Sequence, residues 1–112
     1  MKLIIAVIRP NKLTQVKEAL EEIGVKGLTI SEVRGHGRQR GHREVFRGKE
    51  YNIDLVPKNR IEVAIPDDRL DRVVEAIRNA AITGDVGDGK IFVIPMENAY
   101  RVRTGESGVD AL

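Results

Sequence analysis

The feature that most constrains this chain is an internal repeat with a spacing of 57 residues. Apolar side chains alternate along residues 4–8 and again along 61–65, and the apolar positions of residues 13–20 recur in 70–77. Alternation is typical of a strand with one covered face, and apolar positions three and four residues apart are typical of an amphipathic helix. Each half of the chain therefore begins as a strand and continues as a helix.

Two helices are expected, over residues 13–23 and 70–81. Charged side chains fill the positions between the apolar ones, as on the exposed side of a surface helix. Asp67 and Asp68 stand at the expected start of the second helix, where the helix dipole favours acidic side chains. The apolar positions are Leu13, Val16, Leu20 and Ile23 in the first helix and Leu70, Val73, Val74, Ile77 and Ala81 in the second.

Each expected helix is followed by glycines and a second strand, residues 28–34 in the first half and 91–95 in the second. The order is βαβ–βαβ, so the predicted fold class is α+β, a ferredoxin-like double βαβ sandwich. Because both helices would pack on one face of the sheet, the other face would stay uncovered. Self-association is the simplest way to cover it, and we expect an oligomer.

The size of the chain predicts a single domain over residues 1–112. The longest apolar run, residues 3–8, is far shorter than the roughly 20 residues of a membrane-spanning helix. No export signal is recognisable, so we expect a cytoplasmic protein. The chain has no cysteine, which excludes disulfides and thiolate metal sites.

Charge and aromatic content argue against a nucleic-acid-binding module of the same topology. Nineteen Lys and Arg against seventeen Asp and Glu leave a net charge of only +2, too balanced for binding driven by phosphate attraction. A sheet that stacks bases needs aromatic pairs on neighbouring strands. This chain has four aromatic residues, Phe46, Tyr51, Phe92 and Tyr100.

The two halves are joined by a long connection, residues 36–57, with an expected loop at about 37–55. Loops beyond about 12–15 residues are usually functional or disordered. The connection is therefore either a mobile contact element or an insertion without a function. His36 and His42 lie in it without a carboxylate at a suitable spacing. We interpret both as loop residues, and since no activated nucleophile is recognisable either, we do not expect an enzyme.

A glycine-rich segment, residues 84–90, fits the pattern Gly-x4-Gly-Lys of a phosphate-binding loop. Ile91 replaces the Ser or Thr that would hold magnesium, and the segment leads into a strand instead of a helix. These departures exclude a P-loop NTPase. Backbone N–H groups in such a turn can still bind an anion beside Lys90. The alternative is a plain glycine-rich turn.

Three further cations are candidates for anion binding. Arg101 and Arg103 flank Val102 in a segment expected to be extended, which would put both guanidinium groups on one side. Two arginines suit a polyphosphate, because each can bind oxygens through two N–H groups. Lys58 follows Pro57 at the base of the long connection. The alternatives are a solvated basic tail and an ordinary surface lysine.

Taken together, these segments resemble the PII family of nitrogen-signalling proteins over essentially the whole chain. Residues 83–96 match the second signature of that family at each defined position, and residues 46–51 resemble its first. Shorter matches are Gly35, residues 37–39, 41–42, 57–58 and 101–103. The combination is specific, although no single piece is.

The resemblance implies a ferredoxin-like homotrimer that binds ATP or ADP in clefts between subunits. Residues of the glycine-rich segment, the two C-terminal arginines and Arg38 would bind the phosphates, and Thr29, Glu62 and Ala64 would line the adenine side. Gln39 would help to hold the magnesium of ATP, which 2-oxoglutarate would chelate, and Gln39, Lys58 and Gly87 would bind 2-oxoglutarate. The nucleotide-binding positions that the resemblance implies are Thr29, Gly37, Arg38, Glu62, Ala64, Gly87, Asp88, Gly89, Lys90, Arg101, Val102 and Arg103.

The resemblance also implies a function. The chain would report nitrogen status to an ammonium transporter, to nitrogen-assimilation enzymes or to both. Arg47, near the centre of the long loop, would contact the partner, and a transporter would recruit the protein to the membrane. Tyr51 could be uridylylated, whereas Lys49 stands where some relatives carry a phosphorylated Ser. Phe46 lacks the hydroxyl of the usual Tyr, and a C-terminal loop is expected at about 98–112.

The leading alternative is a ferredoxin-like trimer of the cation-tolerance or amino-acid-binding kind. Such a protein would share the repeat and the uncovered sheet face. It would not need Lys90, Arg101 and Arg103 together.

Overall fold

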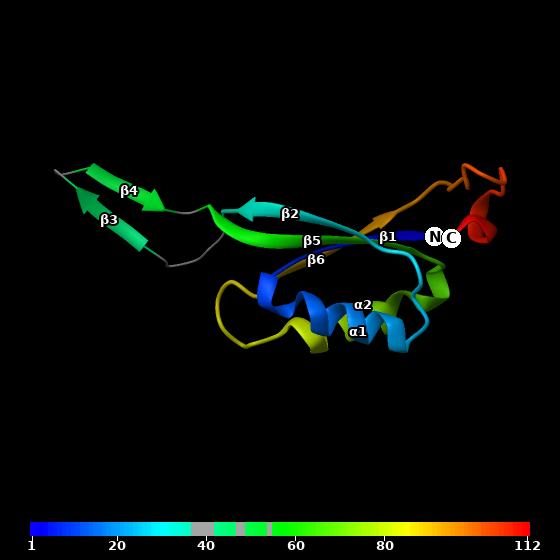
Figure 1. Cartoon of the computed structure of the whole chain (residues 1–112), viewed down its shortest axis with the longest axis horizontal. Helices are drawn as coiled ribbons and strands as arrows, with labels where there is room; N and C mark the ends of the chain where they lie inside the picture. The colour runs from blue at the N-terminus through cyan, green and yellow to red at the C-terminus, as the bar shows by residue number, and fades with distance from the viewer. Residues whose placement is uncertain (37–41, 47–48, 54) are drawn as a thin grey trace.

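The computed structural model describes residues 1–36, 42–46, 49–53 and 55–112. Both strand–helix units of the repeat are present (Figure 1). In chain order, with η for a 3-10 helix, the elements are β1 (Lys2–Ile8), η1 (Pro10–Lys12), α1 (Leu13–Glu22), β2 (Thr29–Gly35), β3 (His42–Phe46), β4 (Lys49–Ile53), β5 (Val56–Ile65), η2 (Asp67–Arg69), α2 (Leu70–Ala81), β6 (Gly89–Pro95) and η3 (Gly108–Ala111).

Four strands form one antiparallel sheet in the order β2-β5-β1-β6. The first strands of the two repeats, β1 and β5, are the central neighbours, with Ile4 opposite Val63 and Ala6 opposite Ile61. The second strands, β2 and β6, lie at the two edges. This interleaving of two βαβ units is the ferredoxin-like arrangement, so the predicted fold class is confirmed.

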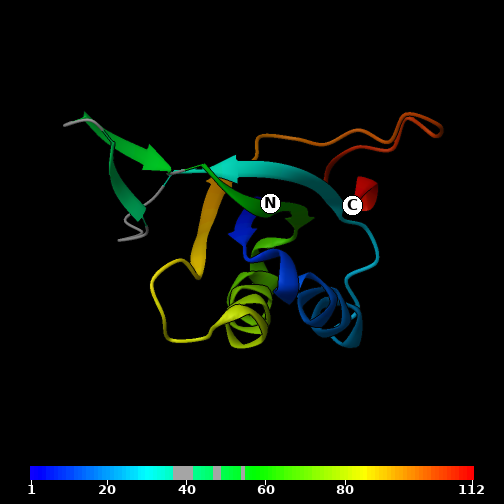
Figure 2. The same cartoon turned by 60° about the vertical axis from the view of Figure 1, so that its left-hand side comes forward.

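Both helices cover the same face of the sheet (Figure 2). Alternate side chains of the central strands, such as Ile4 and Ile61, are fully buried against Val16, Leu20 and Ile77 of the helices. Burial of one such side chain contributes about 1.5–3 kcal/mol, so this layer supplies most of the stability. The alternation that predicted the strands thus has its origin in the helix layer.

Within the described residues, no helix covers the opposite face of the sheet, as predicted. The β1 residues that point to it, Leu3, Ile5 and Val7, are only partly buried. On the neighbouring edge strand, Phe92 and Ile94 stay 47% and 42% exposed. One half of this open face is therefore apolar.

The 57-residue offset extends to the short turns that precede the helices. η1 begins at Pro10 and η2 at Asp67, each directly before its helix. Asp67 and Asp68 lie in the first turn of η2, which runs directly into α2, so they stand at the start of the helical segment as expected. This first turn is a 3-10 turn, because the backbone N–H of Arg69 donates to the carbonyl of Pro66 at 3.1 Å, and the α-helix begins at Leu70.

The long connection between the halves contains a second, two-stranded sheet. β3 and β4 pair antiparallel, with His42 opposite Ile53 and Phe46 opposite Lys49. This hairpin lies beyond the end of the main sheet (Figure 1). The sequence analysis expected a loop here and did not predict strands.

The C-terminal segment differs from the expectation in one respect. Residues 101–105 form a turn and are not extended, so the predicted alignment of the Arg101 and Arg103 side chains is wrong. The turn is closed because the N–H of Gly105 donates to the carbonyl of Arg101 at 2.8 Å, and Gly105 has a φ of +74° that glycine adopts without strain. Tyr100 and Ser107 pair across it.

Within the described part of the chain, no helix is both long enough and apolar enough to span a membrane.

Candidate functional site

The glycine-rich segment between α2 and β6 has an unusual backbone. Gly84, Gly87 and Gly89 have φ values of +93°, +104° and +104°. A Cβ atom at Gly89 would stand 1.7 Å from the carbonyl oxygen of Val7, so only glycine fits there. The segment leads into strand β6, as predicted, and not into the helix that a P-loop requires.

Asp88 shapes this segment from inside. Its carboxylate accepts hydrogen bonds from the backbone N–H groups of Thr83 and Gly84, both at 2.9 Å, and from the Thr83 hydroxyl. The Thr83 hydroxyl, and next the Thr83 N–H, hold the pKa of Asp88 far below its usual range. With its oxygens used in this way, Asp88 supports the loop and has little capacity left for a ligand.

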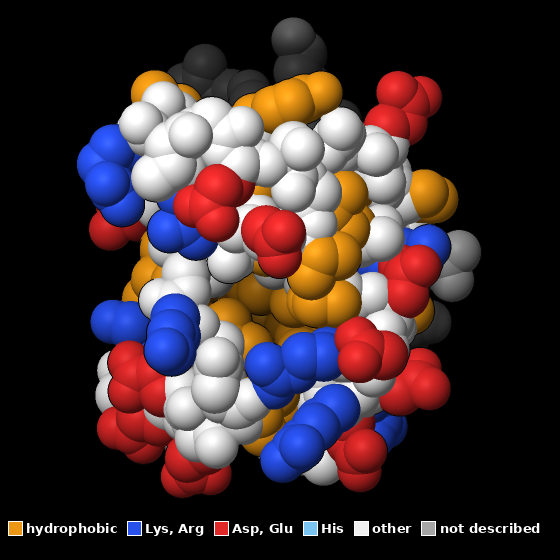
Figure 3. All heavy atoms as spheres, turned by 90° about the vertical axis from the view of Figure 1, so that its right-hand side faces the viewer, with side chains coloured by type: hydrophobic (Ala, Val, Ile, Leu, Met, Phe, Trp, Pro, Cys, Tyr) orange, Lys and Arg blue, Asp and Glu red, His pale blue; other side chains and the backbone are white. Residues whose placement is uncertain are grey.

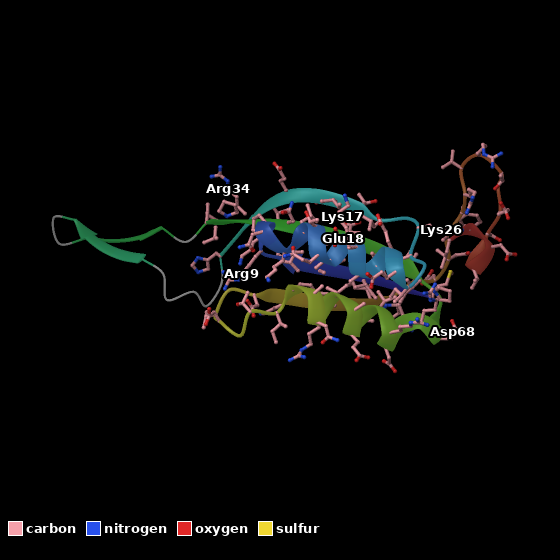
Figure 4. The ribbon with its side chains drawn as sticks, turned by 60° about the horizontal axis from the view of Figure 1, so that its bottom comes forward. Arg9, Lys17, Glu18, Lys26, Arg34 and Asp68 are labelled. Atoms are coloured by element: carbon pink, nitrogen blue, oxygen red, sulfur yellow. The ribbon has the colours of Figure 1, made fainter. Side chains whose placement is uncertain are left out.

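Arg9 fastens the same loop to the sheet, at the end of β1 (Figure 4). Its Nε donates to Asp88 Oδ1 at 3.0 Å, and its Nη2 donates to the carbonyl of Val86 at 2.8 Å. Charge-assisted bonds of this kind are among the stronger ones in proteins. Sequence reasoning missed Arg9, because a single arginine after a strand carries no signal of a partner 79 positions away.

Lys58 holds the loop from the neighbouring strand β5. Its Nζ donates to the carbonyl of Gly87, and only 9% of the residue is exposed. Burial lowers the pKa of Lys58, and the charge of Arg9 lowers it further, whereas Asp88 raises it. The structure thus brings together five of the predicted residues in what we call the glycine-loop cluster: Lys58, Gly87, Asp88, Gly89 and Lys90.

A second group of predicted residues lies at the other end of the sheet. Thr29 and Glu62 are opposite each other on β2 and β5, and Ala64 follows on β5. All three line a cavity with a volume of about 680 Å³, which we call the C-terminal cavity. Figure 3 shows a hollow at this end with hydrophobic side chains on its floor and charged groups at its rim. The other lining residues come from the sheet, from the connection after α1 and from the C-terminal segment: Leu3, Gly24, Val25, Lys26, Gly27, Leu28, Ile65, Pro66, Arg69, Ala99, Val109, Ala111 and Leu112.

Arg101, Val102 and Arg103 lie in the exposed turn beyond β6, at the same end of the molecule as η3 (Figure 1). The Arg101 guanidinium donates to the carbonyl of Leu112 at 3.3 Å, and its Nε lies 4.0 Å from a carboxylate oxygen of Glu106. Both members of this pair are about half exposed. The contact is therefore weak and easily exchanged.

One chain does not unite the two groups of predicted residues. Lys90 lies opposite Val7 and Pro95 opposite Lys2, so β6 runs the length of the sheet between the groups. Five steps of about 3.3 Å separate Lys90 from Pro95, roughly 17 Å, and Arg101 lies farther still. Phosphates at the glycine-loop cluster are therefore out of reach of the same chain's Arg101.

The remaining predicted residues lie in the long connection. Gly37, Arg38, Gln39 and Arg47 fall outside the described residues. Tyr51 lies in β4.

Comparison with known proteins identifies the family. The family model described as nitrogen regulatory protein P-II matches residues 1–106. The chain is 56% identical to the nitrogen regulatory protein P-II of Bradyrhizobium diazoefficiens and 55% identical to that of Azospirillum brasilense. It is 52% identical to the nitrogen regulatory protein GlnK of Escherichia coli K12, and each match covers all of both chains. The chain therefore belongs to the nitrogen regulatory protein P-II family and is a nitrogen-regulatory signal transducer, not an enzyme.

Proposed function

We propose that this protein is a homotrimeric sensor that binds ATP or ADP in clefts between subunits, together with 2-oxoglutarate and magnesium. One observation carries the proposal: the glycine-loop cluster and the C-terminal cavity lie at opposite ends of one sheet. A nucleotide can use both only if the second group comes from a neighbouring subunit. A site built from two chains also makes ligand binding sensitive to assembly.

The open sheet face gives the subunits a reason to associate. Its apolar half is formed by β1 and β6, including Phe92 and Ile94, which are nearly half exposed. Burial of such a patch is favourable at about 25 cal/mol per Å². A closed ring of three copies covers the face in every copy.

The glycine-loop cluster suits the phosphates. Gly87 and Gly89 have positive φ values, backbone N–H groups in such turns can bind an anion, and Lys90 adds a positive charge. In this proposal Arg38 also contributes, and Arg101 and Arg103 of the neighbouring subunit complete the phosphate site. Asp88 takes part through its backbone and by shaping the loop.

The C-terminal cavity suits the base and the sugar. Leu3 and Ala64 offer apolar surface, and Thr29 and Glu62 offer polar groups at adjacent positions of two strands. An apolar cavity with a few convergent polar groups is the usual form of a small-molecule site. Gly37 and Val102 complete the nucleotide contacts in the proposal.

2-oxoglutarate binds beside the phosphates through Gln39, Lys58 and Gly87. Lys58 is bonded to the Gly87 carbonyl, so a ligand carboxylate that attracts this ammonium group competes with the glycine loop. The two ligands are therefore coupled through one hydrogen bond. Because the Asp88 carboxylate is already occupied by N–H donors, magnesium is held by oxygens of the two ligands and by Gln39.

The long connection, at about residues 37–55, transmits the signal to partner proteins. It belongs to a single domain, which ends in a C-terminal loop at about 98–112. Arg47 contacts an ammonium transporter or a nitrogen-assimilation enzyme. If the partner is the transporter, this cytoplasmic protein is recruited to the membrane. Uridylylation of Tyr51 is a further input. Ligand binding favours one loop conformation and the partner favours another.

Calorimetric titration of the purified protein with ATP, alone and with 2-oxoglutarate and magnesium, tests the ligand part. We expect ATP to bind a trimer of 12.5 kDa chains, and 2-oxoglutarate to bind only when ATP and magnesium are present. Lys58→Ala should abolish 2-oxoglutarate binding, whereas Lys17→Ala, an exposed lysine on α1 (Figure 4), should have no effect. A stable monomer in sedimentation, or tight 2-oxoglutarate binding without nucleotide, contradicts the proposal.

A pull-down tests the partner. The organism's own ammonium transporter should retain the wild-type protein in ADP, and Arg47→Ala should reduce retention strongly. Adding ATP, magnesium and 2-oxoglutarate should release the wild type. Equal retention of both proteins, or retention indifferent to 2-oxoglutarate, speaks against Arg47 as the contact.

A further inference from the structure

One wall of the C-terminal cavity has no regular secondary structure. It is the connection between α1 and β2, residues 24–28, and every residue in it lines the cavity. A segment without helix or strand bonds needs other contacts to keep one conformation. The contacts that fix this wall therefore determine the shape of the cavity.

The wall begins at a tight helix end. The N–H of Val25 donates to the carbonyl of Leu20 and the N–H of Gly24 to that of Glu21, both at 3.0 Å, and Gly24 has a φ of +84°. This is the Schellman arrangement, which closes a helix with a left-handed glycine. It fixes the direction in which the chain leaves α1.

The arginine at the end of η2, Arg69, anchors the same point from the other half of the chain. Its Nη2 donates to the carbonyl of Ile23, the residue that caps α1. Its two terminal nitrogens lie 3.8 and 3.9 Å from the position that a Cβ of Gly24 would take. A positive charge at the carboxyl end of a helix is also favoured by the helix dipole.

The base of this anchor is itself tied down. η2 begins with Asp67, whose carboxylate accepts from the amino group of Met1 at 2.9 Å and from Lys2 at 3.4 Å. Figure 4 shows Lys26, in the wall, and Asp68, in η2, at the same end of the molecule. The guanidinium of Arg69 thus reaches the wall from a fixed point.

The two repeats exchange arginine anchors, although the two arginines stand at different positions of the 57-residue offset, where Arg9 corresponds to Pro66 and Arg69 to Lys12. Arg9, at the junction of β1 and α1, holds the loop that follows α2, and Arg69, at the junction of β5 and α2, holds the segment that follows α1. The first of these loops contains the glycine-loop cluster. The second segment lines the C-terminal cavity, so Arg69 fixes one wall of a candidate ligand site, just as Arg9 fixes a candidate ligand loop.

We propose that Arg69 is a positioning residue for the nucleotide: it holds the wall formed by residues 24–28 in the shape that receives the base and sugar, without contacting the phosphates. This inference rests on the proposed nucleotide binding. Arg69 should therefore affect the binding of the base and sugar and leave the binding of the phosphates unchanged.

The test compares two ligands, ATP and inorganic tripolyphosphate, the second of which lacks base and sugar. Arg69→Ala should weaken ATP binding about tenfold, as expected for loss of a charge-assisted hydrogen bond that acts indirectly. Its affinity for tripolyphosphate, measured by competition with ATP, should change by less than about twofold. Arg72→Ala, which removes an exposed arginine on the adjacent α2, is the control and should change neither.

A second readout does not need a ligand. Amide hydrogen exchange of residues 24–28 should be faster in Arg69→Ala than in the wild type or Arg72→Ala, while exchange in β1 and β5 stays the same. If Arg69→Ala does not fold, Arg69→Lys replaces it, with an expected weakening of ATP binding by at least about threefold.

The outcomes separate the inference from the function on which it rests. No ATP binding by the wild type contradicts the proposed function. ATP binding by the wild type that is unchanged in the Arg69 variant contradicts the inference alone. Equal losses for ATP and tripolyphosphate also contradict it, because they indicate damage to the whole fold and not to the wall.

Discussion

The two ends of the sheet present candidate ligand groups in opposite ways. At the glycine-loop end, the loop is held by two partly buried bonds, from Arg9 to Asp88 and from Lys58 to Gly87, and by exposed bonds within the loop to the Asp88 carboxylate. At the C-terminal end, Arg101 and Glu106 are about half exposed and 4.0 Å apart. One end is preorganised, whereas the other can change partners at little cost. A ligand between two subunits would bind the rigid glycine-loop end of one subunit first and then order the C-terminal end of the other. Such ordering on binding can be converted into a signal.

Gly89→Ala should have the largest effect, a loss of stability, because Gly89 lies in the rigid glycine-loop end of the sheet. Its Cβ would collide with the carbonyl of Val7, a backbone atom of the adjacent strand. We expect a loss of more than about 4 kcal/mol in the free energy of unfolding, measured by urea denaturation. Gly84→Ala is the matched control, since its φ is similar but nothing lies within 4 Å of its Cβ. It should cost only about 1–2 kcal/mol. Equal losses would mean that the Val7 contact does not matter.

Arg101→Ala and Arg103→Ala should affect binding and spare stability, because both side chains lie in an exposed turn. A lost charge-assisted hydrogen bond to phosphate costs about 1.5–3 kcal/mol, or roughly a 10- to 100-fold loss of ATP affinity. Calorimetry gives the affinity, and thermal denaturation without ligand should give the wild-type midpoint. Unchanged affinity in both variants would place the phosphates elsewhere.

Asp88→Asn should change the pH dependence of stability. The pKa of Asp88 is lower in the folded chain than in the unfolded one, so its stabilising effect is fully present above the unfolded value of about 3.9 and is lost as pH falls below it. The wild type should therefore lose stability more steeply than Asp88→Asn below about pH 4. Urea denaturation at pH 3 to 6 measures this. Parallel curves would contradict the role of Asp88 in the loop.

Glu106→Gln should have the smallest effect. The variant removes the competitor of a phosphate for Arg101, and an exposed pair of this kind contributes little. ATP affinity should rise, but by no more than about fivefold. A lower affinity would show that Glu106 helps the bound state and does not compete with it.

The sequence predicted the fold well because the fold depends on periodicity. The helix expected at residues 70–81 is α2 (Leu70–Ala81), and the alternation at Ile61 and Val63 marks the buried face of β5. These patterns arise because the apolar side chains on one face of each helix or strand are buried, whereas the side chains on the other face are more exposed. The hairpin of β3 and β4 was missed because each strand has only five residues and lies inside a connection whose length by itself favours a loop.

The candidate site was only partly predictable, for a geometric reason. Sequence patterns identified Lys58, Lys90 and Arg101 as cations, but their separation follows from the direction of β6 across the sheet. The role of Arg9 depends on a contact across 79 positions. The turn at residues 101–105 depends on one left-handed glycine and on Ser107, where an extended segment was equally compatible with the composition.

The exchange of anchors between the repeats makes the halves interdependent. Arg9 of the first half holds the loop of the second, and Arg69 of the second holds the exit of the first. Neither half separated at the connection would retain both a complete sheet and a fixed loop. Two fragments divided within residues 47–48 should each be unfolded alone and regain structure when mixed, as complementing pieces of one cooperative unit. The two repeats visible in the sequence therefore form one folding unit, because each repeat needs the other to fix its loop.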